Sequence, residues 1–383
     1  MRRSGFTPEH EDFRETVRRF VAREVSPNLA AWSEAGTVDR RFYKAAGEAG
    51  LLGLSLDTDY GGAGIRDFRF NAVIAEELCL AGAASVAMCL CGFNNLVSPY
   101  LERLCTLGQK RQWWPGLCLG QKVAAIAMTE PGTGSDLRAI ATRARRDGDH
   151  YRVNGAKTLI SNGMLADVVI LVVSTGEGRE GLSLLLVETD RPGFQRGRPL
   201  SKMGLKAQDT AEFFLDDVRV PAENLLGEEN KALSYLVSNL PQERLTVAVM
   251  ALASVRRMLR QTLEYVRQRK AFGRRIGDFQ NTRFTLAEIS TEAEIAQCFV
   301  DRCIDELARG SLSPTDAAMA KWWVTELQQR TAYRCVQLHG GYGYLMEYPI
   351  AQDALDARAS TLYAGTTEIM KEIIGRSIME AHE

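Results

Sequence analysis

The sequence lacks any block of like charge. Its 47 lysines and arginines are balanced by 48 aspartates and glutamates, for a formal net charge of -1, and the basic residues are scattered along the chain. A nucleic-acid-binding protein usually concentrates basic residues on one face or segment. The charge pattern therefore argues against a nucleic-acid partner and favours a neutral partner or a small ligand.

The chain also lacks the cysteine and histidine spacing of a metal site. Its eight cysteines mostly lie in apolar helical stretches, without CxxC pairs and without histidines nearby. Structural zinc sites and disulfide frameworks need such pairing. We therefore predict reduced cysteines in the core and no metal.

Long apolar runs are missing as well. No stretch reaches the roughly 20 apolar residues that a membrane-spanning helix requires. Glu9, Glu11 and Asp12 interrupt any apolar core near the start of the chain, which argues against a targeting peptide. These features predict a soluble, cytoplasmic protein without membrane contact.

Three blocks of different periodicity are present instead. Residues 1–122 carry apolar residues at helical spacing, such as Phe13, Val17 and Phe20. Residues 123–227 change to short β-rich runs, such as VAAIAM and ADVVILVVS, separated by Gly, Pro or Asp-Gly. Helical patterns return in residues 228–383. The prediction is a mainly α protein with a central β domain, followed by a helical bundle.

The separation of helical and β blocks excludes an alternating βαβ fold. For this reason Gly61, Gly62 and Gly64 are interpreted as a turn and not as a nucleotide-binding loop. A hairpin turn is predicted at Asp147-Gly148, and a turn between helices at residues 310–314.

Residues 128–136 (MTEPGTGSD) close a predicted strand with glycines and hydroxyl side chains. Such a loop can bring backbone N–H groups close to a planar heterocycle or a phosphate. Taken alone, the segment fits a hairpin turn equally well. Its context in the chain decides between these interpretations.

That context is a series of ordered motifs. In their order and spacing they resemble the acyl-CoA dehydrogenase family, from about residue 8 to residue 378. The resemblance implies an N-terminal helical domain, a middle β domain and a C-terminal four-helix bundle, assembled as a homotetramer (a dimer of dimers) that binds FAD. Besides residues 128–136, the motifs are residues 157–163 (KTLISNG), 203–206 (MGLK), 216–221 (DDVRVP), 267–273 (RQRKAFG), 337–343 (QLHGGYG) and 363–368 (YAGTTE).

On this resemblance, Met128 and Thr129 bond the flavin edge, and Ser161 reaches flavin N5 and O4. Ser135 is assigned to the cofactor and also faces the substrate or its carrier. Leu159 is a departure, because the family usually places an aromatic residue there against the flavin. Two more residues are assigned to the cofactor, Thr366 and Glu368.

The resemblance also implies that Arg269 meets the FAD pyrophosphate across a subunit interface, where its guanidinium fork suits paired phosphate oxygens. Without that context, Arg269 reads as a solvated cation at a helix end. Further residues of the facing subunit would line the same dinucleotide, namely Phe272, Gln280, Gln337, Gly340 and Gly341. By contrast, His339 is interpreted as a structural histidine and not as an acid or base.

The implied reaction needs a carboxylate, because the proton beside a thioester is only weakly acidic. Most relatives supply it at the loop position that is Ala364 here. A minority, including the long-chain and isovaleryl branches, supply it from a C-terminal helix, where residues 240–245 (LPQERL) match. The resemblance therefore assigns the base to Glu243. A surface glutamate paired with an arginine is the alternative.

Pro241 favours a first-turn position in its helix, which would place Glu243 near the positive end of the helix dipole. Desolvation would act in the opposite direction, and we expect it to dominate. The backbone N–H of Ala364, with a ribityl hydroxyl of FAD, is the implied donor to the thioester oxygen. Other residues assigned to the substrate are Tyr235, Arg244 and Gly365.

The implied activity is oxidation of an acyl-CoA to a trans-2-enoyl-CoA, with an electron-transferring flavoprotein as acceptor. Three alternatives stay open: a biosynthetic enzyme that acts on acyl carrier protein thioesters, an oxidase or monooxygenase on the same fold, and a non-catalytic flavoprotein. The motifs do not fix the length of the acyl chain.

Overall fold

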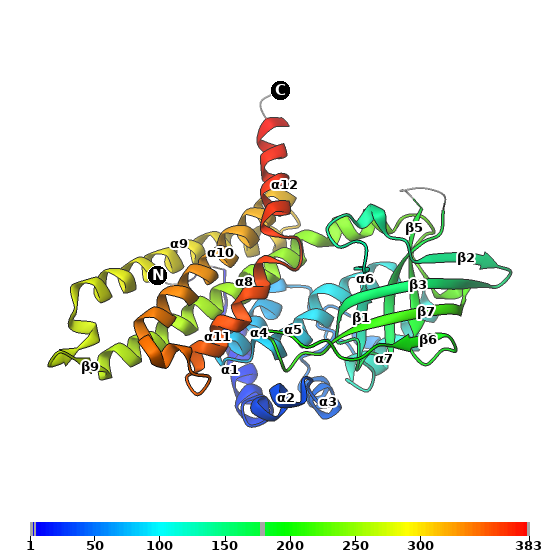
Figure 1. Cartoon of the computed structure of the whole chain (residues 1–383). Coiled ribbons are helices and arrows are strands. Elements are labelled where there is room, and N and C mark those ends of the chain that lie inside the picture. The colour runs from blue at the N-terminus through cyan, green and yellow to red at the C-terminus, as the bar shows by residue number, and fades with distance from the viewer. Residues whose placement is uncertain (1–2, 4, 177–180, 381–383) are drawn as a thin grey trace.

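The computed structural model describes residues 3, 5–176 and 181–380 of the chain. Helices form the first part, a sheet the middle part and helices again the last part, so the predicted fold class is confirmed. In Figure 1 the sheet lies at one end of the molecule, and the long C-terminal helices extend from it to the opposite end.

The N-terminal domain consists of short helices whose starts are set by local side chains. Asp39 and Asp67 accept hydrogen bonds from backbone N–H groups of α3 and α4, and Thr106 forms a capping box with Gln109 in α7. A π-helical turn separates α1 from α2, and another separates α5 from α6. The elements are α1 (Pro8–Phe20), η1 (Val21–Val25), α2 (Leu29–Ala35), α3 (Arg40–Glu48), η2 (Thr58–Tyr60), α4 (Phe68–Leu80), α5 (Ala84–Cys91), η3 (Gly92–Val97), α6 (Ser98–Leu104) and α7 (Leu107–Cys118).

The middle domain is one sheet with the order β6-β7-β3-β2-β4-β5-β8, and β1 pairs with β4 in parallel. In the β2–β3 hairpin Asp147 pairs with His150, so the turn residues are Gly148 and Asp149, one position later than the predicted Asp147-Gly148. Gly148 has a φ of 63°, which a II′ turn requires at this place. The strands are β1 (Ala124–Ala127), β2 (Arg143–Asp147), β3 (His150–Ser161), β4 (Val168–Ser174), β5 (Leu182–Glu188), β6 (Phe194–Arg196), β7 (Thr210–Pro221) and β8 (Leu225–Leu226).

Strand β4 connects the β domain to the helices. Successive side chains of a strand point to opposite faces of the sheet. Ile170 and its alternate neighbours pack in the core shared with the helices, whereas Leu171 and its alternate neighbours pack in a separate core of the β domain. Burial on both faces explains the continuous apolar run of this strand. The end of β1, next to β4, is consequently fixed between the sheet and the helices.

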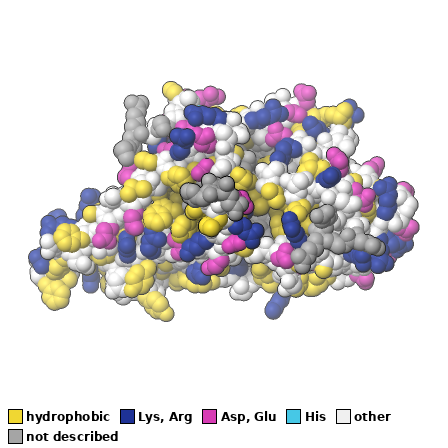
Figure 2. All heavy atoms as spheres, turned by 90° about the horizontal axis from the view of Figure 1, so that it is seen from above, with side chains coloured by type: hydrophobic (Ala, Val, Ile, Leu, Met, Phe, Trp, Pro, Cys, Tyr) yellow, Lys and Arg dark blue, Asp and Glu magenta, His cyan; other side chains and the backbone are white. Residues whose placement is uncertain are grey.

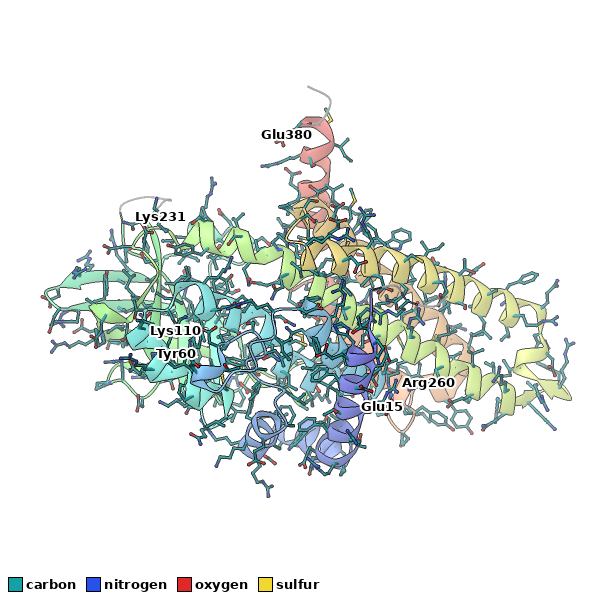
Figure 3. The ribbon with its side chains drawn as sticks, turned by 180° about the vertical axis from the view of Figure 1, so that it is seen from behind. Glu15, Tyr60, Lys110, Lys231, Arg260 and Glu380 are labelled. Atoms are coloured by element: carbon teal, nitrogen blue, oxygen red, sulfur yellow. The ribbon has the colours of Figure 1, made fainter. Side chains whose placement is uncertain are left out.

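Helix α8 (Ala232–Gln268) spans most of the molecule. Its 37 residues correspond to a length of about 55 Å. It begins beside the β domain at Lys231 and passes Arg260 on the way to the opposite end, as Figure 3 shows. There the chain turns through a small hairpin. The remaining elements are β9 (Lys270–Ala271), β10 (Arg274–Arg275), η6 (Ile276–Asp278), α9 (Gln280–Ala308), α10 (Pro314–His339), η7 (Gly340–Tyr344), α11 (Pro349–Ala357), η8 (Arg358–Thr361) and α12 (Thr367–Glu380).

The two predicted turns outside the sheet are also present. Gly61 and Gly64 have φ values of 89° and 67° and lie in a loop after η2. The turn predicted at residues 310–314 connects α9 to α10. All eight cysteines are free, and six of them are buried. No helix in the described part of the chain is long and apolar enough to cross a membrane.

Candidate active site

Glu243 lies on α8 with only 3 % of its surface exposed. Its Oε1 accepts a hydrogen bond from Tyr100 Oη at 3.0 Å and another from Asn239 Nδ2 at 2.8 Å. Tyr100 comes from α6, and Asn239 lies one turn earlier on α8. Both bonds involve Oε1, and no described residue donates to Oε2. The second oxygen is therefore without a hydrogen-bond donor among the described residues.

Burial raises the pKa of Glu243 above its ordinary value. The hydrogen bonds from Asn239 and Tyr100, and the charges of Arg244 and Arg103, oppose this shift without overcoming it. A carboxylate with a raised pKa takes up a proton more readily than an exposed one. The alternative of a surface glutamate is wrong, because the side chain is buried.

The predicted position of Glu243 in the first turn of a helix is also wrong. α8 runs without interruption from Ala232, so Pro241 lies inside the helix and Glu243 is about three turns from its start. Pro241 removes one backbone N–H donor, but the residue is buried and packing maintains the helix. The helix dipole acts over the first turn only, so it does not stabilise this carboxylate.

The loop before α12 carries strained backbone. Ala364 and Gly365 have φ values of 55° and 93°, and this left-handed region is unfavourable for alanine. Two side chains of α10 hold the loop and the first residue of α12 after it. Lys321 Nζ donates to Gly365 O at 2.7 Å, and Glu326 Oε1 accepts from Thr367 Oγ1 at 2.6 Å.

Lys321 connects this loop electrostatically to α8. It is fully buried, and its pKa falls to about 8, first because of burial and then because of the positive charge of Arg244. Arg244 follows Glu243 on α8, and it is buried with an Nε that has no hydrogen-bond partner among the described residues. Lys321 thus bonds Gly365 and lies close enough to Arg244 for the two charges to interact.

The loop after β1 is fixed by a buried ion pair. Lys157 Nζ of β3 lies 2.7 Å from Glu130 Oε1 and donates to Met128 O at 3.1 Å. Glu130 also accepts from the backbone N–H groups of Ala141 and Thr142, at 2.7 and 2.9 Å. Burial lowers the pKa of Lys157 to about 8, although its contact with Glu130 opposes that shift. These contacts hold the end of β1 against β3.

Thr129 and Leu159 meet at this junction. Thr158 N donates to Thr129 O at 3.0 Å, which brings Leu159 beside Thr129. Leu159 is 62 % exposed and has a φ of 59°. Asn162, just after Ser161 at the end of β3, has the same φ and a buried Oδ1 without a partner among the described residues. The end of β3 thus carries an exposed apolar side chain and, three residues later, one unpaired polar atom, a combination that suits a planar ligand with polar edges. Ser161 is half-buried, and Ser135 is exposed in the loop after β1.

The other candidate cofactor residues lie at the opposite end of the molecule. Arg269 is the C-cap of α8, 26 residues after Glu243, which corresponds to about 40 Å along the helix. Its guanidinium carbon lies 5.2 Å from the centroid of the Tyr342 ring. Phe272 is 96 % exposed in the β9–β10 turn, with a φ of 52°. The remaining residues of this group are exposed at the start of α9 and the end of α10, namely Gln280, Gln337, Gly340 and Gly341.

Three further assigned residues lie near the start of α8 or at the start of α12. Tyr235 Oη accepts a hydrogen bond from Glu228 N at 3.2 Å, at the junction with the β domain. It is about 12 Å along α8 from Glu243. Thr366 accepts from Met370 N at 3.0 Å through its carbonyl oxygen, and Glu368 is exposed in the first turn of α12. Both therefore adjoin the loop that Lys321 holds.

Family models for the acyl-CoA dehydrogenase N-terminal, middle and C-terminal domains match residues 7–121, 125–218 and 230–379. The chain belongs to the acyl-CoA dehydrogenase family. It is 46 % identical over 378 residues to the long-chain specific acyl-CoA dehydrogenase, mitochondrial, of Rattus norvegicus, covering 98 % of this chain and 87 % of the rat protein.

Two solved structures show the same likeness. An acyl-CoA dehydrogenase from Geobacillus kaustophilus is 45 % identical with a TM-score of 0.96, covering 98 % of this chain and 100 % of that one. An acyl-CoA dehydrogenase complexed with FAD from Bacillus anthracis is 30 % identical with a TM-score of 0.92, covering 98 % and 68 %. This acyl-CoA dehydrogenase is an FAD-dependent enzyme that acts on acyl-CoA thioesters.

The residues present in this acyl-CoA dehydrogenase fit FAD. Near β3, exposed Leu159 offers an apolar surface to a ring, and the buried Oδ1 of Asn162 is unpaired. At the far end, a Cβ built on Gly340 or Gly341 would meet nothing within 4 Å, so a ligand can approach the backbone closely. His339 is buried beside them, stacks on Tyr265 and bonds Cys335 O through Nδ1 at 2.8 Å, which confirms its structural interpretation.

Several residues that contact the candidate site residues of this acyl-CoA dehydrogenase were not found from the sequence. Asn239 is four residues before Glu243, a spacing that places the two on one face of a helix, but the predicted first turn at Pro241 left Asn239 before the helix. Tyr100 carried no such signal, because 143 residues separate it from Glu243. Lys321 lies in the helical run AAMAKWWV and reads as an ordinary helix lysine. Glu130 and Lys157 lie within quoted motifs, but their pairing was not predicted.

Proposed function

We propose that this enzyme oxidises long-chain acyl-CoA thioesters to trans-2-enoyl-CoA, with Glu243 as the base. The burial of Glu243, with one oxygen bonded by Tyr100 and Asn239 and the other left without a donor, is the observation that supports this role. The likeness to the long-chain enzyme of rat supports the substrate class.

In this proposal Glu243 Oε2 takes the proton from the carbon beside the thioester carbonyl. The two hydrogen bonds to Oε1 fix the carboxylate rotamer, so that Oε2 faces the substrate. Bound FAD supplies the oxidant that accepts the hydride from the β-carbon. The backbone N–H of Ala364 donates to the thioester oxygen as negative charge develops there, and nearby Arg244 adds a positive field. Gly365 completes the substrate loop.

The residues at the junction of β1 and β3 would hold the flavin in this proposal. Leu159 would pack on the ring, and the polar groups of Met128, Thr129 and Ser161 would bond its edge. Ser135, exposed in the adjoining loop, faces the substrate carrier as well. Tyr235 lies toward the β-domain end of α8 and is assigned to the substrate channel. Thr366 and Glu368, at the start of α12, bond the cofactor.

The separation of the two groups of cofactor residues supports a dimer. About 40 Å of α8 lies between Glu243 and Arg269, which is more than one dinucleotide spans. We therefore assign Arg269 and Phe272 to the FAD bound mainly by a second subunit. The other members of that set are Gln280, Gln337, Gly340 and Gly341.

The outer faces of α9, α10 and α12 support assembly of two such dimers into a homotetramer. In Figure 2 hydrophobic side chains gather in the middle of the face from which α12 projects. Apolar patches of this kind mark contacts between subunits. Exposed apolar residues of these helices include Phe284, Ile295, Trp323, Tyr333, Ile378 and Met379.

The electron acceptor in this proposal is an electron-transferring flavoprotein. Eight free cysteines fit a reducing compartment, and we keep the cytoplasm as the proposed location.

We also propose domain boundaries at residues 122/123 and 227/228.

Anaerobic bleaching of the flavin tests the proposed reaction. The holoenzyme is mixed with palmitoyl-CoA, butyryl-CoA, isovaleryl-CoA or palmitoyl acyl carrier protein, and flavin absorbance is followed without oxygen. Palmitoyl-CoA should bleach the flavin fastest, and the reduced enzyme should reoxidise slowly in air. Bleaching only by the carrier protein conjugate would contradict the CoA assignment. Fast peroxide formation would indicate an oxidase, and no bleaching by any thioester would disprove catalysis.

A further inference from the structure

We propose that Lys321 is a positioning residue, which orients the Ala364–Gly365 loop toward the thioester oxygen by bonding the Gly365 carbonyl. This inference rests on the proposed function. Lys321 itself does not touch the substrate in this scheme. It acts through the peptide groups of the loop.

The first argument is geometric. Lys321 and Glu326 are five residues apart on α10, and they contact the Ala364–Gly365 loop and the first residue of α12 directly after it. Lys321 Nζ donates to Gly365 O at 2.7 Å, and Glu326 Oε1 accepts from Thr367 Oγ1 at 2.6 Å. These two bonds anchor the loop on a rigid helix, directly after its left-handed turn.

The second argument concerns backbone strain. Ala364 has a φ of 55°, and an alanine in this region costs about 1–2 kcal/mol. Such a conformation persists only where surrounding contacts fix it. Without the bond from Lys321, the loop could relax to a conformation in which the N–H of Ala364 no longer faces the substrate.

The third argument concerns the location of the charge. Lys321 is 0 % exposed, and its one side-chain hydrogen bond within the described residues is to a backbone carbonyl. An ammonium group without a bonded carboxylate is costly to bury. Arg244 lies close enough to act electrostatically on Lys321. The carboxylates of Glu326 and Glu368 attract Lys321 without bonding it, so its one hydrogen bond directs the ammonium group to the Gly365 carbonyl.

A pair of ligands tests this proposal in the holoenzyme. The first is a long-chain 3-oxoacyl-CoA, which ionises to an enolate with charge on the thioester oxygen. The second is the alkyl-CoA thioether of equal length, which lacks that oxygen. In Lys321→Met the dissociation constant of the 3-oxoacyl-CoA should rise about 10- to 100-fold, as for loss of a charge-assisted hydrogen bond. The dissociation constant of the thioether should change less than about 3-fold.

Thr325→Val is the matched control. Thr325 is buried on the same helix, and its Oγ1 bonds the backbone carbonyl of Lys321 at 2.8 Å. The substitution disturbs α10 without removing the contact to Gly365. It should lower the melting temperature and leave the ratio of the two dissociation constants unchanged.

Three outcomes would overturn the proposal. In the first, Lys321→Met binds the 3-oxoacyl-CoA as tightly as the wild type does. In the second, Lys321→Met weakens binding of the 3-oxoacyl-CoA and of the thioether by the same factor. In the third, Thr325→Val changes the ratio of the two dissociation constants as strongly as Lys321→Met does. If Lys321→Met does not fold, Lys321→Gln keeps a neutral donor at the same position and should shift the ratio in the same direction by a smaller factor. An unchanged ratio in folded Lys321→Gln would overturn the proposal too. Failure of the proposed function is distinguishable, because wild-type flavin would then resist bleaching by every acyl thioester.

Discussion

Tyr100 donates a hydrogen bond of 3.0 Å to Glu243 across a sequence separation of 143 residues. The contact joins α6 of the N-terminal domain to α8 of the C-terminal helices. A hydrogen bond to the ionised form of a carboxyl lowers its pKa, whereas burial raises it. The position of the base and its basicity therefore depend on packing between two domains.

Replacement of the base tests its assignment. Glu243→Gln keeps the shape of the side chain but cannot take up the proton. FAD content and binding of acyl-CoA should stay near those of the wild type, while anaerobic flavin reduction should slow at least about 100-fold. Stopped-flow absorbance measures this rate. Glu264→Gln, at an exposed position of the same helix, is the control and should react normally. Near-normal bleaching by Glu243→Gln would remove Glu243 from the mechanism.

The hydroxyl of Tyr100 should influence the pH dependence of the reaction. Its hydrogen bond lowers the pKa of Glu243, so Tyr100→Phe should raise that pKa further. A base acts in its ionised form, so activity rises as pH passes through the pKa of the base. The rising limb of kcat/KM should therefore move to higher pH in Tyr100→Phe, with a loss of roughly 3- to 10-fold on the acid side. A profile measured with palmitoyl-CoA checks the direction. A shift to lower pH, or none, would contradict the contact.

The sequence predicted those parts of the molecule that depend on local pattern. Block periodicity predicted the helical, β and helical regions, and Gly148 marked a real hairpin turn. Contacts between distant segments left no local signal, as the pairing of Tyr100 with Glu243 shows. The helix start predicted at Pro241 was wrong. Prolines are common in the first turn of a helix, but packing keeps this proline inside a long helix. A lysine such as Lys321 looks like a surface residue until the fold shows that it is buried.

The ion pair of Lys157 and Glu130 should matter for stability and for retention of FAD. Lys157 is fully buried, so removal of its partner leaves an uncompensated charge. Glu130→Gln should lower the free energy of unfolding by about 3–5 kcal/mol, and the flavin should be released more easily because the end of β1 loses its anchor. Denaturant unfolding and fluorescence of released flavin measure the two effects.

A second substitution separates charge from packing at this pair. The double variant Glu130→Gln with Lys157→Met removes both charges and should recover part of the lost stability. Lys206→Met, at an exposed lysine, is the control and should unfold like the wild type. A double variant that is less stable than both single variants would show that the pair acts in another way.

Complementation between subunits tests whether Arg269 serves the active site of its neighbour. Arg269→Ala alone should weaken FAD binding about 10- to 100-fold, because a charged contact to phosphate is lost.

In a mixed dimer of Glu243→Gln and Arg269→Ala subunits, one site carries both defects and the other carries neither. With equal expression and random pairing, half of the dimers are mixed, so about a quarter of all sites should be active. Co-expression of Glu243→Gln with Glu243→Ala is the control, because no pairing restores an intact site. If co-expressed Glu243→Gln and Arg269→Ala subunits showed no more activity than the two variants purified separately, the assignment of Arg269 to the active site of its neighbour would be wrong.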